Sequence, residues 1–380
     1  MNIVYLDNAA TSFPKPESVY LTLDRFARTA LANPGRAGHK MALEAEHELD
    51  TGRHLLNQLF HGVAPERFIF TLNCTDALNM ALKGVLREGD HVITTDLEHN
   101  SVSRPLRAME LAGFISLTRI ASDRDGLTDP DAVAKAIGSR TRLIAMTHAS
   151  NVLGTIQPVA EIGRIARQHD VLFLVDAAQT AGTVPIDVQT MHIDLLAFPG
   201  HKGLFGPTGT GALYVGPRAK LRPWREGGTG GDSSSPTQPT ELPYYLEGGT
   251  PNVLGVAGLN AGIRFVMERG PEELRRHEVA LTDQLAKGLS DLGCRVFGCR
   301  DPQRCVGTLS FKSETLAAGD LAAILDSEFR IAIRPGLHCA PYVHKAQGTF
   351  PDGTVRVSPG PFNTSADIEY LLSALRQILG

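Results

Sequence analysis

The sequence predicts an α/β protein built around a mainly parallel β-sheet. Short apolar runs rich in β-branched and aromatic residues alternate with stretches of helical periodicity between residues 67 and 215, as buried parallel strands and their crossover helices do. The chain of 380 residues also exceeds the size at which a single core usually stops growing. We therefore expect one large domain and one smaller domain.

Seven apolar runs predict the strands of the sheet, and helical patterns separate most of them. The predicted strands cover residues 67–70, 90–95, 114–120, 142–148, 171–176, 195–198 and 211–215. The predicted helices cover residues 75–87, 101–112, 129–138 and 158–168. This order predicts a sheet that lies between two layers of helices.

The C-terminal part of the chain predicts a smaller α+β domain. Residues 217–251 are rich in Gly, Pro, Ser and Thr and predict a long functional loop, with a flexible excursion of no function as the alternative. The elements predicted after it are helices at 253–269 and 271–292, strands near 306–311 and 330–333, and a helix at 366–379. The expected division is a segment at 1–15 that joins the small domain and the active site, a large domain at 16–255 and a small domain at 256–380.

Composition and charge argue against several classes of protein. The 37 basic and 41 acidic residues give a net charge of -4 without a block of one sign, so nothing favours a nucleic-acid partner. The amino terminus lacks the pattern of a secretory signal, and no stretch approaches the roughly 20 apolar residues of a membrane-spanning helix. We expect a cytoplasmic protein with no membrane contact. The five cysteines form no C-x-x-C pair, which argues against a disulfide framework or a metal site.

The stretch FPGHKGLFGPTGTG surrounds Lys202 with glycines. The spacing excludes a phosphate-binding P-loop, and it excludes a dinucleotide fingerprint because the glycines run into a strand instead of a helix. A lysine at the end of a buried strand can attack a carbonyl when desolvation lowers its pKa, and glycines let a bulky cofactor approach the backbone. A solvated surface lysine is the alternative.

Polar residues also follow other predicted strands. We expect them to lie at one edge of the sheet, because the carboxyl ends of parallel strands meet there. Asp176 ends VLFLVD, where it can pair with a protonated ring nitrogen or cap a helix, and Gln179 is nearby. His99 and Asn151 each follow a strand, and the ring of His99 can stack on an aromatic cofactor or serve a structural role. Thr75 begins a helix whose free N–H groups suit a phosphate, with simple capping as the alternative.

Several motifs in a fixed order resemble a known family. The chain contains LDNAAT, the strand-end pair EH, SNVLGT, VDAAQ, GHK followed by GPTGTGALY, GGTPN and RPGLHCAP. This set is similar to the class V, fold-type I pyridoxal-phosphate (PLP) enzymes, in the branch of cysteine desulfurases and selenocysteine lyases. The resemblance runs from Tyr5 to about Thr364, and it implies the fold-type I architecture and PLP as the cofactor.

The resemblance implies a role for each residue at the sheet edge. Lys202 would carry PLP as a Schiff base, and Asp176 would bond the pyridinium nitrogen, which makes the ring an electron sink. His99 would stack on the ring as a catalytic residue. Gln179 and Asn151 would bond the phenolic oxygen or the substrate.

The phosphate group of PLP has its own implied contacts. Thr75 and His201 would hold the phosphate, and Cys74 would line the same turn without reacting. Thr250, in GGTPN, is similar to a threonine that reaches the phosphate of the neighbouring subunit, which implies a homodimer. Pro199 departs from the family, which commonly has a serine near this position as a phosphate ligand.

The segment IRPGLHCAPYVHK holds Cys339 between possible positive neighbours. Arg334 and His338 would favour a reactive thiolate at Cys339, whereas an ordinary buried thiol is the alternative. The resemblance implies that Cys339 attacks the substrate sulfur and becomes a persulfide. Its short loop is similar to that of desulfurases that depend on a partner protein for sulfur acceptance.

Arginines near both ends of the chain predict binding of an amino-acid substrate. Arg356 lies in a predicted strand, and its planar guanidinium group suits an α-carboxylate. Arg334 is a second candidate for this contact. The segment NPGRAGH is similar to one that brings Arg36 and His39 towards the active site.

The resemblance therefore implies a sulfur-transferring enzyme, a PLP-dependent cysteine desulfurase that converts L-cysteine to L-alanine. The alternatives are a selenocysteine lyase, a cystine or other C–S lyase on the same scaffold, and a PLP-binding partner protein without turnover, since fold and cofactor do not determine the substrate. Neither the sulfur acceptor nor the pathway follows from the sequence.

Overall fold

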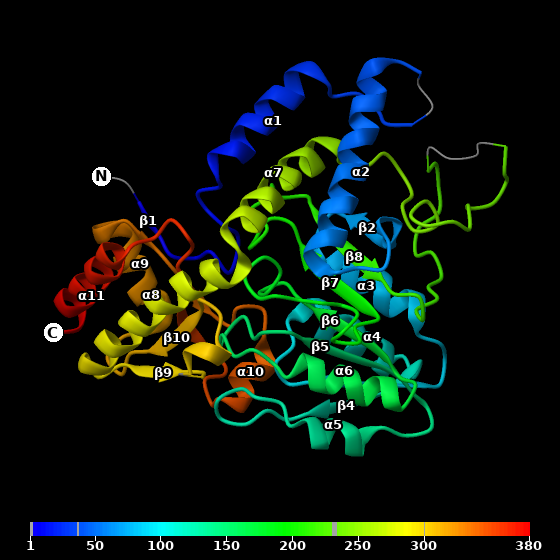
Figure 1. Cartoon of the computed structure of the whole chain (residues 1–380). Helices are drawn as coiled ribbons and strands as arrows, with labels where there is room; N and C mark the ends of the chain where they lie inside the picture. Colours follow the sequence, from blue (N-terminus) through cyan, green and yellow to red (C-terminus); the bar gives the residue numbers. More distant parts are fainter. Residues whose placement is uncertain (1–2, 36–37, 230–233, 300) are drawn as a thin grey trace.

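The chain forms a large α/β part and a smaller α+β part (Figure 1). The computed structural model describes residues 3–35, 38–229, 234–299 and 301–380. Within these ranges, every helix is too short or too polar to cross a lipid bilayer. The described residues also contain no group of three or more His, Cys, Asp or Glu side chains that could hold a metal ion.

A seven-stranded sheet forms the centre of the large part, in the spatial order β2-β8-β7-β6-β5-β3-β4. The strands are β2 (Phe68–Thr71), β3 (Asp90–Thr95), β4 (Ile115–Ile120), β5 (Thr141–Thr147), β6 (Leu172–Asp176), β7 (Leu195–Pro199) and β8 (Gly211–Val215). Strands β3, β4, β5, β6 and β7 run parallel to one another, and β8 is antiparallel to its neighbours β2 and β7. The predicted mainly parallel sheet is confirmed.

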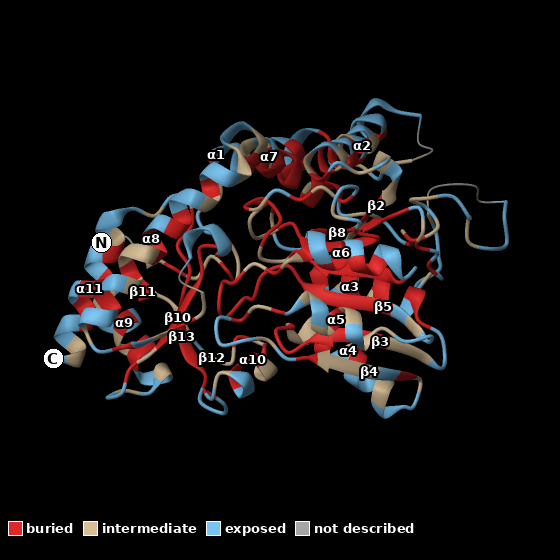
Figure 2. Cartoon of the chain, turned by 60° about the horizontal axis from the view of Figure 1, so that its bottom comes forward, coloured by how far each residue is buried: buried red, intermediate tan, exposed pale blue. Residues whose placement is uncertain are grey.

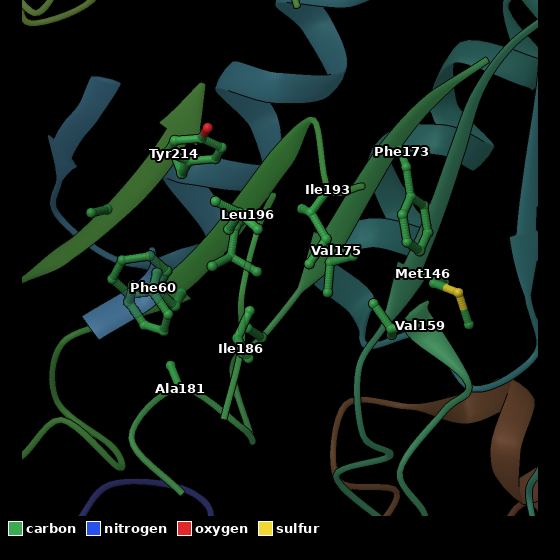
Figure 3. Packing of buried hydrophobic residues seen from close by; sticks show 14 of the residues in the cluster. Phe60, Met146, Val159, Phe173, Val175, Ala181, Ile186, Ile193, Leu196 and Tyr214 are labelled. Atoms are coloured by element: carbon green, nitrogen blue, oxygen red, sulfur yellow. The ribbon is translucent and has the colours of Figure 1, made fainter. Parts of the chain in front are cut away.

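Helices cover both faces of this sheet through two apolar cores. The helices of the large part are α1 (Glu17–Thr29), α2 (Lys40–Phe60), α3 (Cys74–Val85), α4 (Asn100–Leu111), α5 (Pro130–Ala136), α6 (Val159–Gln168) and α7 (Val253–Arg269). Figure 2 shows buried central strands beneath helices with exposed outer surfaces. Figure 3 shows part of one core, with Phe60, Leu196 and Tyr214 among its side chains. The rings of Phe60 and Phe198 in this core have centroids 4.8 Å apart. Truncating the buried Phe173 of this core to alanine would cost about 3–5 kcal/mol.

The smaller part is built on an antiparallel sheet in the order β12-β13-β10-β9. Its elements are α8 (Pro271–Asp291), β9 (Arg295–Phe297), β10 (Leu309–Lys312), α9 (Ala318–Phe329), β12 (Arg334–Gly336), α10 (Pro341–Ala346), β13 (Thr354–Val357) and α11 (Ser365–Leu379). The amino-terminal strand β1 (Val4–Tyr5) pairs in parallel with β11 (Ile331–Ala332). Helix α7 packs on α1 and α2 and leads into α8 (Figure 1).

The predicted elements of the large sheet lie close to their expected bounds, and the described residues of 217–251 contain no helix or strand, as expected for a loop. The strand expected from residue 306 begins only at Leu309. The backbone of Val306 instead donates to the carbonyl of Gly154, at 2.9 Å. The domain boundaries at residues 15 and 255 remain a prediction.

Candidate active site

A cavity of about 210 Å³ lies at the carboxyl edge of the sheet, beside the ends of β5 and β6. Parallel strands present their carboxyl ends at one edge, where ligands bind in open α/β sheets. Most of the predicted site residues line this cavity, which we call the Lys202 cavity: Cys74, Thr75, His99, Asn151, Asp176, Gln179, His201, Lys202, Arg334 and Arg356. The fold thus brings residues from both parts of the chain into one site.

Lys202 follows β7 in a loop held to the amino-terminal segment. The hydroxyl of Ser12 donates to the carbonyl of Lys202 at 3.0 Å. Burial, followed by Arg356, lowers the pKa of Lys202 to about 8, and Asp176 opposes this shift. Within the described ranges, no hydrogen bond or ion pair engages the Nζ atom of Lys202. The amine therefore has a neutral, nucleophilic fraction at mildly alkaline pH.

Asp176 is a buried carboxyl group at the end of β6. Its Oδ1 atom accepts from the backbone N–H of Ala178 at 2.9 Å and from the thiol of Cys74 at 3.5 Å. Burial raises the pKa of Asp176, and the Ala178 N–H and Lys202 oppose this rise. Asp176 does not cap a helix, because residues 177–194 contain no helix or strand. Oδ1 instead holds the turn at Ala178, and Oδ2 has no hydrogen bond in the described part of the chain.

A chain of hydrogen bonds joins the starts of α3 and α4. The hydroxyl of Ser101 lies 2.7 Å from Thr75 Oγ1 and 2.9 Å from His99 Nδ1. The backbone N–H of Ser101 donates to His99 Nδ1 at 3.1 Å, so the proton of the neutral ring is on Nε2. Burial, followed by Lys202, lowers the pKa of His99 to about 4. Sequence reasoning missed Ser101, although DLEHNS places its hydroxyl two residues after His99.

The amino-terminal segment closes another side of the Lys202 cavity. Gln179 Nε2 donates to the carbonyl of Ala9 at 3.2 Å, and His201 Nδ1 lies 3.1 Å from Thr11 Oγ1. Lys15 Nζ donates to the carbonyl of His201 at 2.8 Å. Burial, followed by Lys202, lowers the pKa of His201 to about 4, so its ring is neutral at physiological pH.

Two arginines lie side by side where β12 pairs with β13. Arg334 is opposite Arg356 in the register, and Arg356 is only 1% exposed. Arg356 donates to Asp7 Oδ1 at 2.6 Å and to the carbonyl of Asn151 at 3.2 Å, while its Nε atom is buried without a partner among the described residues. Two cations with one carboxylate nearby attract a further anion. Sequence reasoning missed Asp7, although it lies in LDNAAT.

Cys339 lies beside the Lys202 cavity in a tight turn after β12. His338 and Cys339 have φ angles of 47° and 58°, a left-handed conformation that is costly for residues other than glycine and recurs at functional sites. Arg334 Nη2 lies 3.8 Å from Cys339 Sγ, and the carbonyl of Cys339 accepts from the N–H of Asn100 at 2.7 Å. The thiol is half-buried.

The expectation that His338 is a positive neighbour of Cys339 is wrong. His338 is buried, and its Nε2 donates to the carbonyl of Thr354 at 3.1 Å. Burial, followed by Arg356, lowers the pKa of His338 to about 2. The imidazole is therefore neutral, and Arg334 is the cation that contacts the thiol.

Two of the predicted residues that the structure describes lie away from the Lys202 cavity. His39 is exposed and caps α2, where its Nδ1 accepts from the N–H of Ala42 at 3.2 Å. Thr250 is exposed and lines a separate cavity of about 650 Å³, together with Asn33. Arg36 lies outside the described residues.

The comparisons with known proteins agree with this architecture. The family model "Aminotransferase class-V" matches residues 4–371, and the chain belongs to this family. Members of the family use PLP. The residues of the Lys202 cavity fit this cofactor, since Asp176 Oδ2 and Lys202 Nζ are both without partners in the described structure, and hydroxyl groups stand at a helix start.

Several similar proteins carry the name cysteine desulfurase. The chain is 36% identical to a probable cysteine desulfurase of Methanothermobacter thermautotrophicus, over 99% of this chain and 95% of the relative. It is 37% identical to a probable cysteine desulfurase of Halalkalibacterium halodurans, over 99% and 93%. A solved cysteine desulfurase of Thermococcus onnurineus superposes with a TM-score of 0.93 at 34% identity, over 99% of this chain and 94% of the other. The expected family and the fold-type I architecture are confirmed.

Proposed function

We propose that this chain is a PLP-dependent cysteine desulfurase, which converts L-cysteine to L-alanine and holds the removed sulfur on Cys339. The observation that carries the proposal is that Arg334 lines the Lys202 cavity and also contacts the Cys339 thiol, at 3.8 Å. A nucleophilic sulfur is thereby placed beside the amine that would hold the cofactor. The names of the relatives support the same activity.

The residues around Lys202 would hold PLP in a defined orientation. Lys202 would bind it covalently, the free Oδ2 of Asp176 would accept from its ring nitrogen, and the neutral ring of His99 would lie against it. Gln179 and Asn151 would bond its phenolic oxygen or the substrate. When bound, PLP supplies an electron sink for the electrons of the substrate Cα–H bond.

Hydroxyl groups at the start of two helices would hold the phosphate. The Thr75 and Ser101 hydroxyl oxygens are 2.7 Å apart. The positive end of α3 would favour an anion there, although Asn73 Oδ1 already accepts from the N–H of Asp76 at 2.9 Å. His201 would contribute from the opposite loop. We propose that Ser101 supplies the hydroxyl that Pro199 does not provide, since both residues line the Lys202 cavity.

The two arginines would bind the α-carboxylate of the substrate. Asp7 and the carbonyl of Asn151 orient the guanidinium group of Arg356, and an α-carboxylate would add the negative charge that the Arg334–Arg356 pair lacks. A carboxylate held there places the rest of a small amino acid between Lys202 and Cys339.

Two side chains would carry out the chemical step: the amine of Lys202 would move a proton, and the thiol of Cys339 would take the sulfur. Lys202 takes and returns the α-proton, for which a pKa of about 8 is suitable. The thiolate of Cys339 attacks the substrate sulfur, and a new S–S bond forms as the C–S bond breaks. The electron pair of the C–S bond stays on Cβ, which takes up the proton that the Cys339 thiol has lost. L-Cysteine and the Cys339 thiol thus become L-alanine and a Cys339 persulfide, with no net oxidation.

We also propose a homodimer that passes sulfur to an acceptor protein. Within one chain, His39 and Thr250 lie outside the Lys202 cavity, so a neighbouring subunit would be needed for these two residues to reach it. The short turn that holds Cys339 supports a route in which the acceptor protein docks on the enzyme and takes the sulfur from Cys339. We propose a cytoplasmic location, which the free state of all five cysteines supports.

The test is an assay of alanine and sulfide formation from L-cysteine, L-selenocysteine and L-cystine. The wild type is expected to form alanine from L-cysteine, Cys339→Ala is expected to lose this activity, and Cys294→Ala, which changes a buried thiol in the smaller part, is expected to keep it. Retention of alanine formation by Cys339→Ala would overturn the desulfurase mechanism. Product from selenocysteine or cystine alone would assign a lyase, and PLP binding without any product would assign a non-catalytic protein.

A further inference from the structure

A second cavity lies in the smaller part of the chain and shares no lining residue with the Lys202 cavity. Its volume is about 260 Å³, and it lies between α8 and the strands β9 and β10. Its walls are largely apolar, with Val279, Ala286 and Leu309 among them. Two cysteines, Cys299 and Cys305, also line it.

A tight turn brings these two cysteines together. The 3-10 helix η2 (Pro302–Arg304) lies between them, and the Asp301 side chain caps it by accepting from the N–H of Gln303 at 2.9 Å. The chain therefore reverses, and the Cys305 thiol donates to the carbonyl of Cys299 at 3.0 Å. Both thiols line the same cavity, and Asp301 N–H donates to the Cys299 thiol at 3.4 Å within the same turn.

The two thiols differ in their access to solvent. Cys299 is half-buried and also lines an open groove at the surface beside Arg295 and Arg304. Cys305 is buried, and burial, followed by the Cys299 thiol, raises the pKa of Cys305 to about 12. A reagent from solvent therefore meets Cys299 first, with the protonated Cys305 directly behind it.

We propose that Cys299 and Cys305 form a redox modification site, at which a small-molecule disulfide such as oxidised glutathione converts the dithiol to an intramolecular disulfide. The Cys299 thiolate attacks one sulfur of the oxidant, whose S–S bond breaks and releases one thiol. Cys305 then attacks the Cys299 sulfur of this mixed disulfide and releases the second thiol. Two electrons pass from the protein to the oxidant, and the two thiol protons leave on the two released thiols.

The dithiol lies at a junction between the two parts of the chain. The N–H of Cys299 donates to Thr155 Oγ1 at 3.3 Å, and the N–H of Ile156 donates to the carbonyl of Arg304 at 2.8 Å. Thr155 and Ile156 follow Asn151, which lines the Lys202 cavity. A disulfide would therefore reduce the freedom of the loop that contacts this segment.

The experiment oxidises the full-length, cofactor-loaded protein with oxidised glutathione at neutral pH, followed by alkylation, proteolysis and mass spectrometry. The wild type is expected to lose two free thiols together, with a mass decrease of about 2 Da for the two hydrogens, and to yield a cross-link between Cys299 and Cys305. Reduced glutathione is expected to restore both thiols. This measurement does not depend on desulfurase activity, and the wild type alone is sufficient.

Variants distinguish the order of attack. Cys305→Ser is expected to retain glutathione on Cys299, whereas Cys299→Ser is expected to leave Cys305 unmodified because it is buried. Cys294→Ser is the matched control, a buried cysteine of the same part that should leave the cross-link unchanged. A wild type that carries glutathione on Cys299 without a cross-link, or in which Cys299 and Cys305 both stay reduced while Cys339 reacts, would overturn the proposal.

Discussion

Cys74 and Cys339 both lie at the Lys202 cavity, and their neighbours carry opposite charges. The thiol of Cys74 is buried 3.5 Å from the carboxyl group of Asp176, and burial, followed by Asp176, raises the pKa of Cys74 well above its usual range. The thiol of Cys339 is half-buried and lies 3.8 Å from the guanidinium group of Arg334. The charge and exposure around the two thiols therefore predict that Cys339, and not Cys74, is the reactive sulfur.

The sharpest test of this difference replaces each sulfur by oxygen. Cys339→Ser is expected to reduce alanine formation from L-cysteine by at least about 1,000-fold because the nucleophile is lost. Cys74→Ser is expected to change it less than about threefold, since a protonated, buried thiol takes no part in the step. Steady-state assays of alanine measure both, and equal losses would contradict the distinction.

A second test removes the cation beside Cys339. In Arg334→Gln, alkylation of Cys339 by iodoacetamide at pH 7 is expected to slow about tenfold, because the cation that lies 3.8 Å from the Cys339 sulfur is removed. Arg295→Gln is the control, since Arg295 is exposed and stacks on Phe297 instead. Peptide mapping gives the rates, and identical rates in the two variants would show that Arg334 does not activate the thiol.

The pH dependence of Lys202 acetylation tests how the carboxylate of Asp176 affects the Lys202 amine. Burial lowers the pKa of Lys202 to about 8 while Asp176 raises it. Acetylation of Lys202 by acetic anhydride in cofactor-free protein should therefore rise with pH through a midpoint near 8. Asp176→Asn is expected to move this midpoint to lower pH, because a negative neighbour that stabilised the ammonium form is gone. A midpoint that moves to higher pH would contradict this arrangement.

The smallest expected effect concerns Cys74 itself. Because burial is the first cause of its raised pKa and Asp176 only the second, Asp176→Asn is expected to change iodoacetamide labelling of Cys74 by less than about twofold. Labelling is read by mass spectrometry on the same samples. If Cys74 in this variant reacted as fast as Cys339, the carboxylate and not burial would be the protecting feature.

Much of the large sheet could be predicted because its strands are apolar runs separated by helical periodicity, and both signals are local. The small part was less predictable. Strand β12 reads Arg-Pro-Gly, residues that argue against a strand, and β1 and β11 are two residues long, too short to show an alternating pattern. These strands exist because partners distant in the sequence supply their hydrogen bonds.

The sequence by itself determined which side chains end or closely follow the strands of the large sheet, among them Asp176 at the end of β6 and Lys202 after β7, since parallel strands present their carboxyl ends at one edge. Only the tertiary structure decided how they are supported. Asp7 and Arg356 are 349 residues apart and joined by an ion pair, and Cys305 reaches Cys299 only because η2 reverses the chain. Such contacts depend on packing between separate segments, which carries no local signal, whereas strand ends follow from periodicity within a few residues.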